Sequence, residues 1–276
     1  MRTLDRSFAD TLFSVMRHGH VASPRGRKVK EIIHGDAFFS MEQPVCTLPL
    51  RKFGYRFMCA EAAWILSGDN RLATIAPFSK FIWEFSDDGL FYQGAYGPKV
   101  VDQLTYVCDV LTADPETRQA VIDVWRPNPR AGRDIPCTLS FQFLIRDGKI
   151  DCVQTMRSSD VWLGYPYDAF NASMLTGYVM LALKYRKEGS LKDLKLGTHY
   201  LSAGSQHVYE PQWLDAMKVV DDEPGFEYRS FNPYEFNSPQ HLIDHLWRLA
   251  GHDWNALPDG MFLVNELFER ANASRS

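Results

Sequence analysis

The chain has 276 residues, of which 45% are hydrophobic and 23% are charged, and its formal net charge is −4. This balance is typical of a compact globular protein and excludes a disordered or fibrous chain. The negative charge argues against general binding to nucleic acid, because phosphate neutralisation needs a clustered basic surface. No strong internal boundary divides the sequence, so we predict a single domain over residues 1–276.

The cysteine pattern and the hydropathy indicate the compartment. An odd number of widely spaced cysteines without CxxC spacing predicts neither a disulfide framework nor a metal site. The amino terminus lacks the apolar core of a signal peptide, and no stretch of about 18 apolar residues could span a bilayer. We therefore expect a cytoplasmic protein with no membrane partner. The cysteines are Cys46, Cys59, Cys108, Cys137 and Cys152.

Two helices are predicted in the first quarter of the chain. Residues 5–19, DRSFADTLFSVMRHG, carry apolar side chains at helical spacing and end in glycine. Residues 55–69, YRFMCAEAAWILSGD, give a second helix in which Glu61 lies among apolar neighbours. The aromatic and glycine-rich text from 69 to 100 predicts loops.

Alternating β-branched residues predict strands in the middle of the chain. RQAVIDVW at 118–125 gives one strand, and TLSFQFLI at 138–145 with IDCVQTMR at 150–157 gives a hairpin that turns at an Asp-Gly pair. This hairpin should bring Cys137, at the start of one strand, close to Arg157, at the end of its partner.

The last predicted elements are a long helix and two strands. PYDAFNASMLTGYVMLALKYR at 166–186 is apolar nearly all round, which predicts a buried helix with Pro166 in its first turn. LKLGTHYLSAG at 194–204 and SQHVYEPQ at 205–212 each resemble a strand. Because strands and helices mix without regular βαβ alternation, the fold class is predicted to be α+β.

Cys137 alone does not indicate chemistry. Free cysteine is among the most buried residue types, so an isolated cysteine is more often a small hydrophobe than a nucleophile. A nucleophilic thiol needs a nearby cation to stabilise its thiolate, and Arg157 from the paired strand would supply one. Arg157 alone equally fits a solvated strand end.

A set of ordered motifs resembles the thymidylate synthase family over roughly residues 20 to 215. MRSSDVWLGYPYD at 156–168 resembles the nucleotide-binding run of that family, and the Pro-Cys pair upstream resembles its nucleophile. Four shorter segments match in order. They are EAAWILSGDN at 61–70 (catalytic glutamate helix), GAYG at 94–97 (tyrosine loop), DPETR at 114–118 (intersubunit arginine) and GSQHVY at 204–209 (sugar-binding His-x-Tyr).

The resemblance implies a fold and a reaction. The fold would be a mixed sheet packed with helices, forming a homodimer through the sheet. The Cys137 thiolate would add to C6 of a pyrimidine nucleoside monophosphate, and C5 would then attack the methylene group of 5,10-methylenetetrahydrofolate. Glu61 would relay protons, with a pKa raised by its apolar helix. Its alternative reading is an acid on the helix surface.

The resemblance also implies phosphate ligands. Arg157 and Ser158 match the phosphate-binding positions, and a guanidinium fork suits a phosphate dianion. Arg25, in the stretch SPRGR, would be the arginine of a mobile loop, with Arg27 as the alternative. Arg118 would reach a phosphate across the dimer interface, although Gln119 replaces the family's usual second arginine.

The remaining implied site residues bind the sugar, the base and the folate. His207 and Tyr209 would hold the sugar hydroxyl, although an exposed edge strand would also place both on one face. Asp160 matches a position that contacts both nucleotide and folate, and Gly164 one that contacts folate. Two aromatic residues complete the implied site, Tyr96 as a catalytic residue and Trp83 as a folate contact.

Asp168 stands where thymidylate synthases carry an asparagine that reads uracil. An ionised aspartate cannot donate to O4 of uracil, but it can accept from the exocyclic amine of cytosine. The alternative is an acid that merely suits the amino end of a helix. We therefore expect deoxycytidylate as the substrate.

Cytosine recognition points to the hydroxymethylase branch of the family, in which water quenches the reaction instead of folate hydride. Thr138 in place of the family's histidine, and the tail ERANASRS, favour this outcome. Trp83, which would shield the intermediate from water, favours reductive methylation of deoxycytidylate or deoxyuridylate. Hydroxymethylation of cytidylate or deoxyuridylate, and a non-catalytic relative that binds nucleotide or RNA, are further alternatives.

Overall fold

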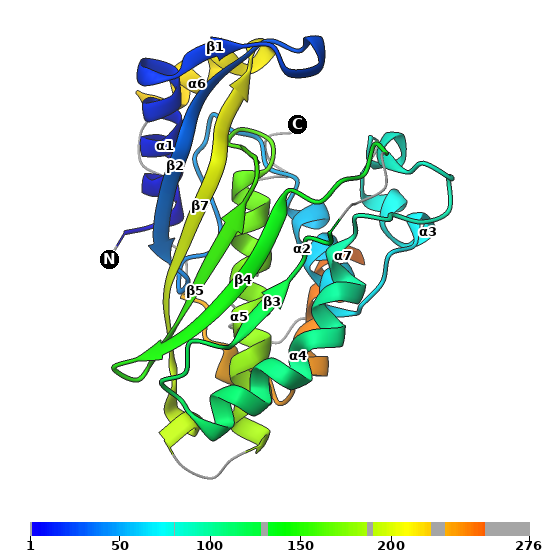
Figure 1. Cartoon of the computed structure of the whole chain (residues 1–276), viewed down its shortest axis with the longest axis vertical. Helices are drawn as coiled ribbons and strands as arrows, with labels where there is room; N and C mark the ends of the chain where they lie inside the picture. The colour runs from blue at the N-terminus through cyan, green and yellow to red at the C-terminus, as the bar shows by residue number, and fades with distance from the viewer. Residues whose placement is uncertain (1, 80, 128–131, 187–189, 222–229, 252–276) are drawn as a thin grey trace.

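The computed structural model describes residues 2–79, 81–127, 132–186, 190–221 and 230–251. Its centre is a mixed β-sheet (Figure 1). The strands are β1 (His20–Ala22), β2 (Val29–Ser40), β3 (Val121–Asp123), β4 (Thr138–Arg146), β5 (Lys149–Met156), β6 (Ser159–Asp160) and β7 (Lys195–Tyr209).

The strand order is β1-β2-β7-β5-β4-β3, and β6 pairs with β7 outside this path. β7 runs antiparallel to β2 and parallel to β5. The sheet contains both parallel and antiparallel pairs, and the helices do not alternate regularly with the strands, which confirms the predicted α+β class. Since β7 has a neighbour on each side, the reading of His207 and Tyr209 as part of an exposed edge strand is wrong. The two strand pieces predicted between 194 and 212 form one strand, because β2 is long enough to pair with both.

The predicted hairpin of β4 and β5 is confirmed. Asp147 and Gly148 both have positive φ, 49° and 70°, as a two-residue hairpin turn requires. The ladder places Thr138 opposite Met156, and just outside it the Arg157 amide donates to the Cys137 carbonyl at 2.9 Å. The expected approach of these two residues is therefore present in the backbone itself.

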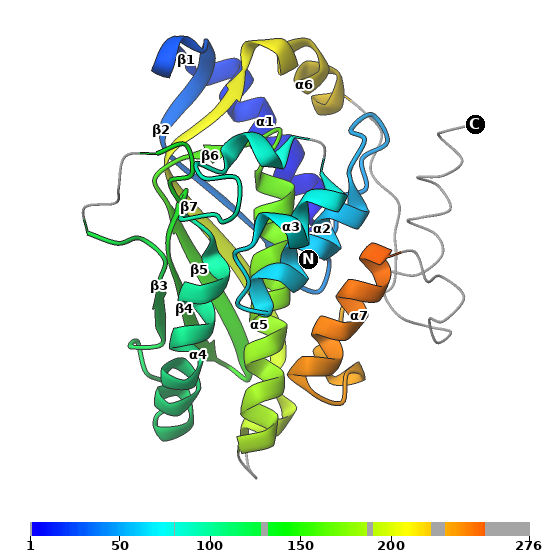
Figure 2. The same cartoon turned by 90° about the vertical axis from the view of Figure 1, so that its right-hand side faces the viewer.

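Helices cover the sheet and complete a continuous hydrophobic core. α5 packs against β5 and β7, and Figure 2 shows it between the sheet and α7. The helices are α1 (Leu4–His18), α2 (Tyr55–Leu66), α3 (Leu72–Ile75), α4 (Tyr96–Ala113), α5 (Tyr165–Arg186), α6 (Trp213–Val220) and α7 (Pro239–Gly251). Within the described residues, no helix has both the length and the apolar character needed to cross a membrane.

The region from 69 to 100, which was predicted as loops, also holds α3, two short 3₁₀ turns (Ala76–Phe78 and Ile82–Phe85) and the start of a long helix. α4 begins inside it at Tyr96 and continues for 18 residues. Val100, Leu104, Val107 and Leu111 give it a buried helical stripe. The start of α4 was not predicted, because the sequence before it is rich in glycine.

Gly97 fixes how closely α4 approaches the end of α2. A Cβ added there would lie 2.7 Å from the Asp69 carbonyl oxygen and 3.1 Å from the Gly68 carbonyl carbon. Both are backbone atoms, which cannot rotate away. The close contact between α4 and the end of α2 therefore leaves no room for a side chain at position 97, next to Tyr96.

Gly97→Ala should lower the free energy of unfolding by about 1–3 kcal/mol, the usual cost of overpacking, although alanine favours a helix. The measurement is urea unfolding followed by circular dichroism. Gly251→Ala is the control, because an added Cβ there has no atom of the described residues within 4 Å. An unchanged or higher midpoint for Gly97→Ala would show that the backbone contact does not constrain this position.

Candidate active site

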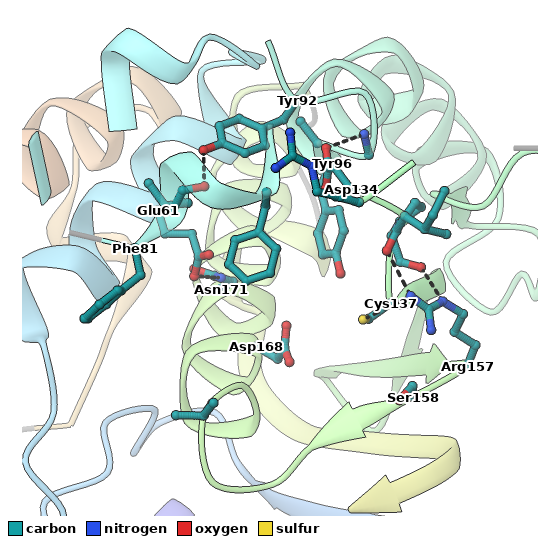
Figure 3. Close-up of a pocket in the computed structure, with 18 of the residues that line it drawn as sticks. Glu61, Phe81, Tyr92, Tyr96, Asp134, Cys137, Arg157, Ser158, Asp168 and Asn171 are labelled. Atoms are coloured by element: carbon teal, nitrogen blue, oxygen red, sulfur yellow. Dashed lines mark hydrogen bonds between the residues drawn. The ribbon is translucent and has the colours of Figure 1, made fainter. Parts of the chain in front are cut away.

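A cavity of about 1060 Å³ opens where β4 begins, β5 ends and α2, α4 and α5 converge (Figure 3). Side chains from widely separated parts of the sequence line it. Nine of the predicted site residues are among them: Arg25, Glu61, Tyr96, Cys137, Arg157, Ser158, Asp168, His207 and Tyr209.

Cys137 and Arg157 form one wall of the cavity. Arg157 Nη2 lies 3.6 Å from Cys137 Sγ, and its guanidinium also donates to the carbonyls of Pro136 and Ile135. Burial raises the pKa of the Cys137 thiol, and Arg157 opposes this effect. Burial thus favours the neutral thiol, whose activation needs a proton acceptor.

Gly204 of β7 controls where Arg157 lies. A Cβ added to Gly204 would lie 3.0 Å from the Arg157 carbonyl oxygen. The strand thus approaches the Arg157 backbone closely because this position has no side chain.

Glu61 lies on α2 and faces the cavity (Figure 3). It is therefore not an acid on the outer surface of the helix, which was the alternative interpretation. Burial raises the pKa of its carboxyl to about 7, and a hydrogen bond from Asn171 works in the opposite direction. Asn171 Nδ2 donates to Glu61 Oε2 at 2.8 Å. A carboxyl with this pKa can both accept and donate a proton near neutral pH.

Asp168 lies in the first turn of α5 and lines the same cavity. Burial raises the pKa of its carboxyl well above the usual value, and the charges of Glu61 and Asp160 raise it further. Its position thus satisfies both readings, an acid at the amino end of a helix and a polar group that faces the cavity.

Tyr96 connects the cavity wall to the start of β4. Its hydroxyl accepts from the Thr138 amide at 3.1 Å, and burial raises its pKa. Thr138 itself is fully buried, and its Oγ1 accepts from Gln154 Nε2 at 2.8 Å. The threonine hydroxyl is therefore held inside the sheet.

Arg25, Ser158, His207 and Tyr209 also line the cavity. Arg25 adopts a left-handed backbone conformation, with φ 53°. His207 and Tyr209 share one face of β7, with ring centroids 5.2 Å apart. Of the two arginines predicted as alternatives, Arg25 lines the cavity and Arg27 does not.

Four predicted site residues lie outside the cavity lining. Arg118 is exposed after α4, and Trp83 is 59% exposed. Asp160 Oδ1 accepts from the amides of Trp162 and Leu163, and Gly164 donates its amide to the Asp160 carbonyl. The roles assigned to these four residues stay predictions, as do the roles of the nine that line the cavity.

Sequence reasoning missed several residues of the cavity wall. Asn171 lies one helical turn after Asp168, and that spacing alone could have placed it on the same face. Asp134 holds the Gly94 amide at 2.7 Å, next to the start of α4. Phe81, Ile82 and Phe85 add an apolar wall, which follows from the fold of a loop and had no periodic signal.

Comparisons with known proteins agree with this geometry. The family model described as thymidylate synthase matches residues 6–232. A protein of Bacillus phage SP01 named deoxyuridylate hydroxymethyltransferase is 30% identical over 237 residues, which is 78% of this chain and 59% of that protein. The chain thus spans about three fifths of the length of this curated relative. The chain belongs to the thymidylate synthase family.

Proposed function

We propose that the protein is a one-carbon transferase that hydroxymethylates C5 of a pyrimidine deoxynucleoside monophosphate, with deoxycytidylate as the preferred substrate. One observation carries this proposal. Cys137 Sγ and the carboxyls of Glu61 and Asp168 face one cavity, which Arg25 and His207 also line. A nucleophile, a proton relay and a base reader thus share a cavity with groups suited to phosphate and sugar.

The chain's own residues prepare the nucleotide for reaction. The guanidinium groups of Arg157 and Arg25 suit a phosphate dianion, and His207 and Tyr209 suit a sugar hydroxyl. Addition of the Cys137 sulfur to C6 then makes C5 nucleophilic. Glu61 exchanges protons with the base and its surroundings, since its pKa of about 7 suits both directions.

The apolar wall supports methylenetetrahydrofolate as the one-carbon donor. Phe81, Ile82 and Phe85 present aromatic and aliphatic surface to the cavity, which suits a flat aromatic ring system. When bound, the folate supplies a one-carbon unit at the oxidation level of formaldehyde. We propose that Trp83, Asp160 and Gly164 contribute to this site only after movement or indirectly, because none of them lines the cavity.

Three features support water as the final nucleophile. Trp83, the side chain predicted to exclude water, is 59% exposed. Thr138 occupies the position of the family's histidine, and its hydroxyl is bonded inside the sheet. The phage relative carries the name of a hydroxymethyltransferase. The tail ERANASRS, which the sequence also offered, lies outside the described residues.

Deoxyuridylate is the second candidate substrate. The phage relative is named for deoxyuridylate, and burial raises the pKa of the Asp168 carboxyl. A neutral carboxyl can accept from N3–H and donate to O4 of uracil, as an asparagine does. An ionised carboxyl favours cytosine, because it can accept a hydrogen bond from the exocyclic amine of that base.

We also propose a homodimer that associates through the sheet. Phe38 of β2 and Tyr200 of β7 are exposed, 46% and 45%, and their rings stack with centroids 6.3 Å apart. Exposed apolar pairs of this kind are typical of protein interfaces. Arg118 is exposed and outside the cavity of its own chain, as a residue that serves the partner's site would be.

A reducing cytoplasm suits the chain. All five cysteines are free thiols, and four of them are buried. The nucleophile proposed here would be inactivated by oxidation, so we place its activity in the cytoplasm.

Cys137→Ala should reduce hydroxymethylated product by at least about 10³-fold, because the covalent route is lost. The measurement is the mass of the nucleotide product after incubation with deoxycytidylate and methylenetetrahydrofolate. Cys108→Ala, at a buried position in α4, should retain activity. A methylated product from the unaltered protein, or undiminished product from Cys137→Ala, would contradict the proposed reaction.

Asp168→Asn should change the ratio of kcat/KM for deoxycytidylate to that for deoxyuridylate at least tenfold in favour of uracil. The proposed preference for deoxycytidylate needs the ionised carboxyl of Asp168. A hydrogen bond to a charged group is worth about 1.5–3 kcal/mol, and about 1.4 kcal/mol corresponds to tenfold. The control is Asp215→Asn, an exposed aspartate of α6 that pairs with Lys218. If both variants keep the original ratio, Asp168 does not read the base.

The kcat/KM of the unaltered protein should rise as pH passes through about 7, because the Glu61 pKa is raised to that value and its ionised form accepts protons. Glu61→Gln should lose this inflection and about 10²–10⁴-fold in rate. Glu116→Gln, at an exposed position, should keep the full profile. An inflection that persists in Glu61→Gln would assign it to another group.

A further inference from the structure

Asn171 is the one side chain in the described part of the molecule that hydrogen-bonds the Glu61 carboxyl. Its Nδ2 donates to Oε2 at 2.8 Å across the contact between α5 and α2. Figure 3 shows Asn171 directed towards Glu61, with Asp168 one turn away on the same helix. Both side chains line the cavity.

The amide oxygen of Asn171, Oδ1, lowers the stability of the folded protein. Oδ1 is buried and has no hydrogen-bond partner within the described residues. A buried acceptor without a partner destabilises a protein by about 1–3 kcal/mol. At the same position in α5, leucine would fill similar space without this cost. A residue present for stability alone would therefore be apolar, which points to a functional role for the Nδ2 contact.

We propose that Asn171 is a positioning residue for the last step of the reaction: it holds Oε2 of Glu61 so that Oε1 receives a proton from the attacking water. This inference rests on the proposed hydroxymethylation. Among the described residues Oε1 makes no hydrogen bond, so one oxygen of the carboxyl is anchored and the other is available.

The step balances without a further reactant. The water oxygen bonds to the exocyclic methylene carbon on C5 of the base, and its proton passes to Glu61 Oε1. The electron pair of the exocyclic double bond moves into the ring and forms the C5–C6 double bond. The bond between C6 and sulfur breaks, and Cys137 leaves as a thiolate, which then takes the proton from Glu61.

The groups around Glu61 set the direction of the expected pH effect. Asp168 on α5 repels a second negative charge, and Tyr96 contributes a hydroxyl from α4. On α7, which also packs against α2, the charge of Arg248 acts on His245 and not on Glu61. The Asn171 hydrogen bond opposes the effect of burial, so its loss should raise the Glu61 pKa further.

The test compares Asn171→Leu with the unaltered protein. Asn171→Leu should keep the melting temperature, because the unpaired Oδ1 is removed while Oε2 of Glu61 loses its donor. It should also keep the dissociation constant for deoxycytidylate and lower kcat by about 10²-fold, the scale of a misplaced catalytic group. The inflection of the pH profile should move above about 7. Ser173→Ala, which removes a buried hydroxyl from the same helix, should change none of these values.

Asn171→Asp separates hydrogen bonding from shape. It keeps the shape of asparagine but replaces the donor with a second carboxyl, so the inflection should move to higher pH than in Asn171→Leu. A normal kcat and an unmoved inflection in both variants would overturn the inference and leave the proposed function intact. Absence of hydroxymethylated product from the unaltered protein would instead overturn the proposed function.

Discussion

The hydrogen bond between the Arg157 amide and the Cys137 carbonyl is the contact on which the site depends. It closes the open end of the β4–β5 hairpin and keeps the sulfur and the guanidinium on one wall. β6, which follows β5, pairs in parallel with β7, and this register places Asp160 beside His207, which lines the cavity. A slip of one residue would turn the side chains of β5 to the other face.

Burial is the common cause of the unusual acidities in the cavity. It raises the pKa of Cys137, Glu61 and Asp168, all of which are negative when ionised. Like charges in one cavity resist simultaneous ionisation, so the titration of one group affects the others. The recognition of the base and the proton relay that we propose would thus be linked, because the three groups share one electrostatic environment.

Local chemistry explains what the sequence predicted correctly. The Asp147–Gly148 turn and the glycine after α2 need only neighbouring residues, so their patterns were sufficient. α4 was missed because glycines precede its apolar stripe. The contact of Asn171 with Glu61 joins helices more than 100 positions apart, and no local pattern reports such packing. A residue that acts in the site of a partner subunit, as we propose for Arg118, likewise has no local sequence pattern that reports its role.

The bare position on β7 has a consequence for engineering. A Cβ added at Gly204 would lie 3.0 Å from the Arg157 carbonyl oxygen, so the absence of a side chain there allows the strand to approach the Arg157 backbone closely. Graded substitutions there would act as a spacer of adjustable thickness. They would shift the Arg157 backbone, and with it the phosphate contact that we propose for this residue, while every residue of the cavity wall stays unchanged.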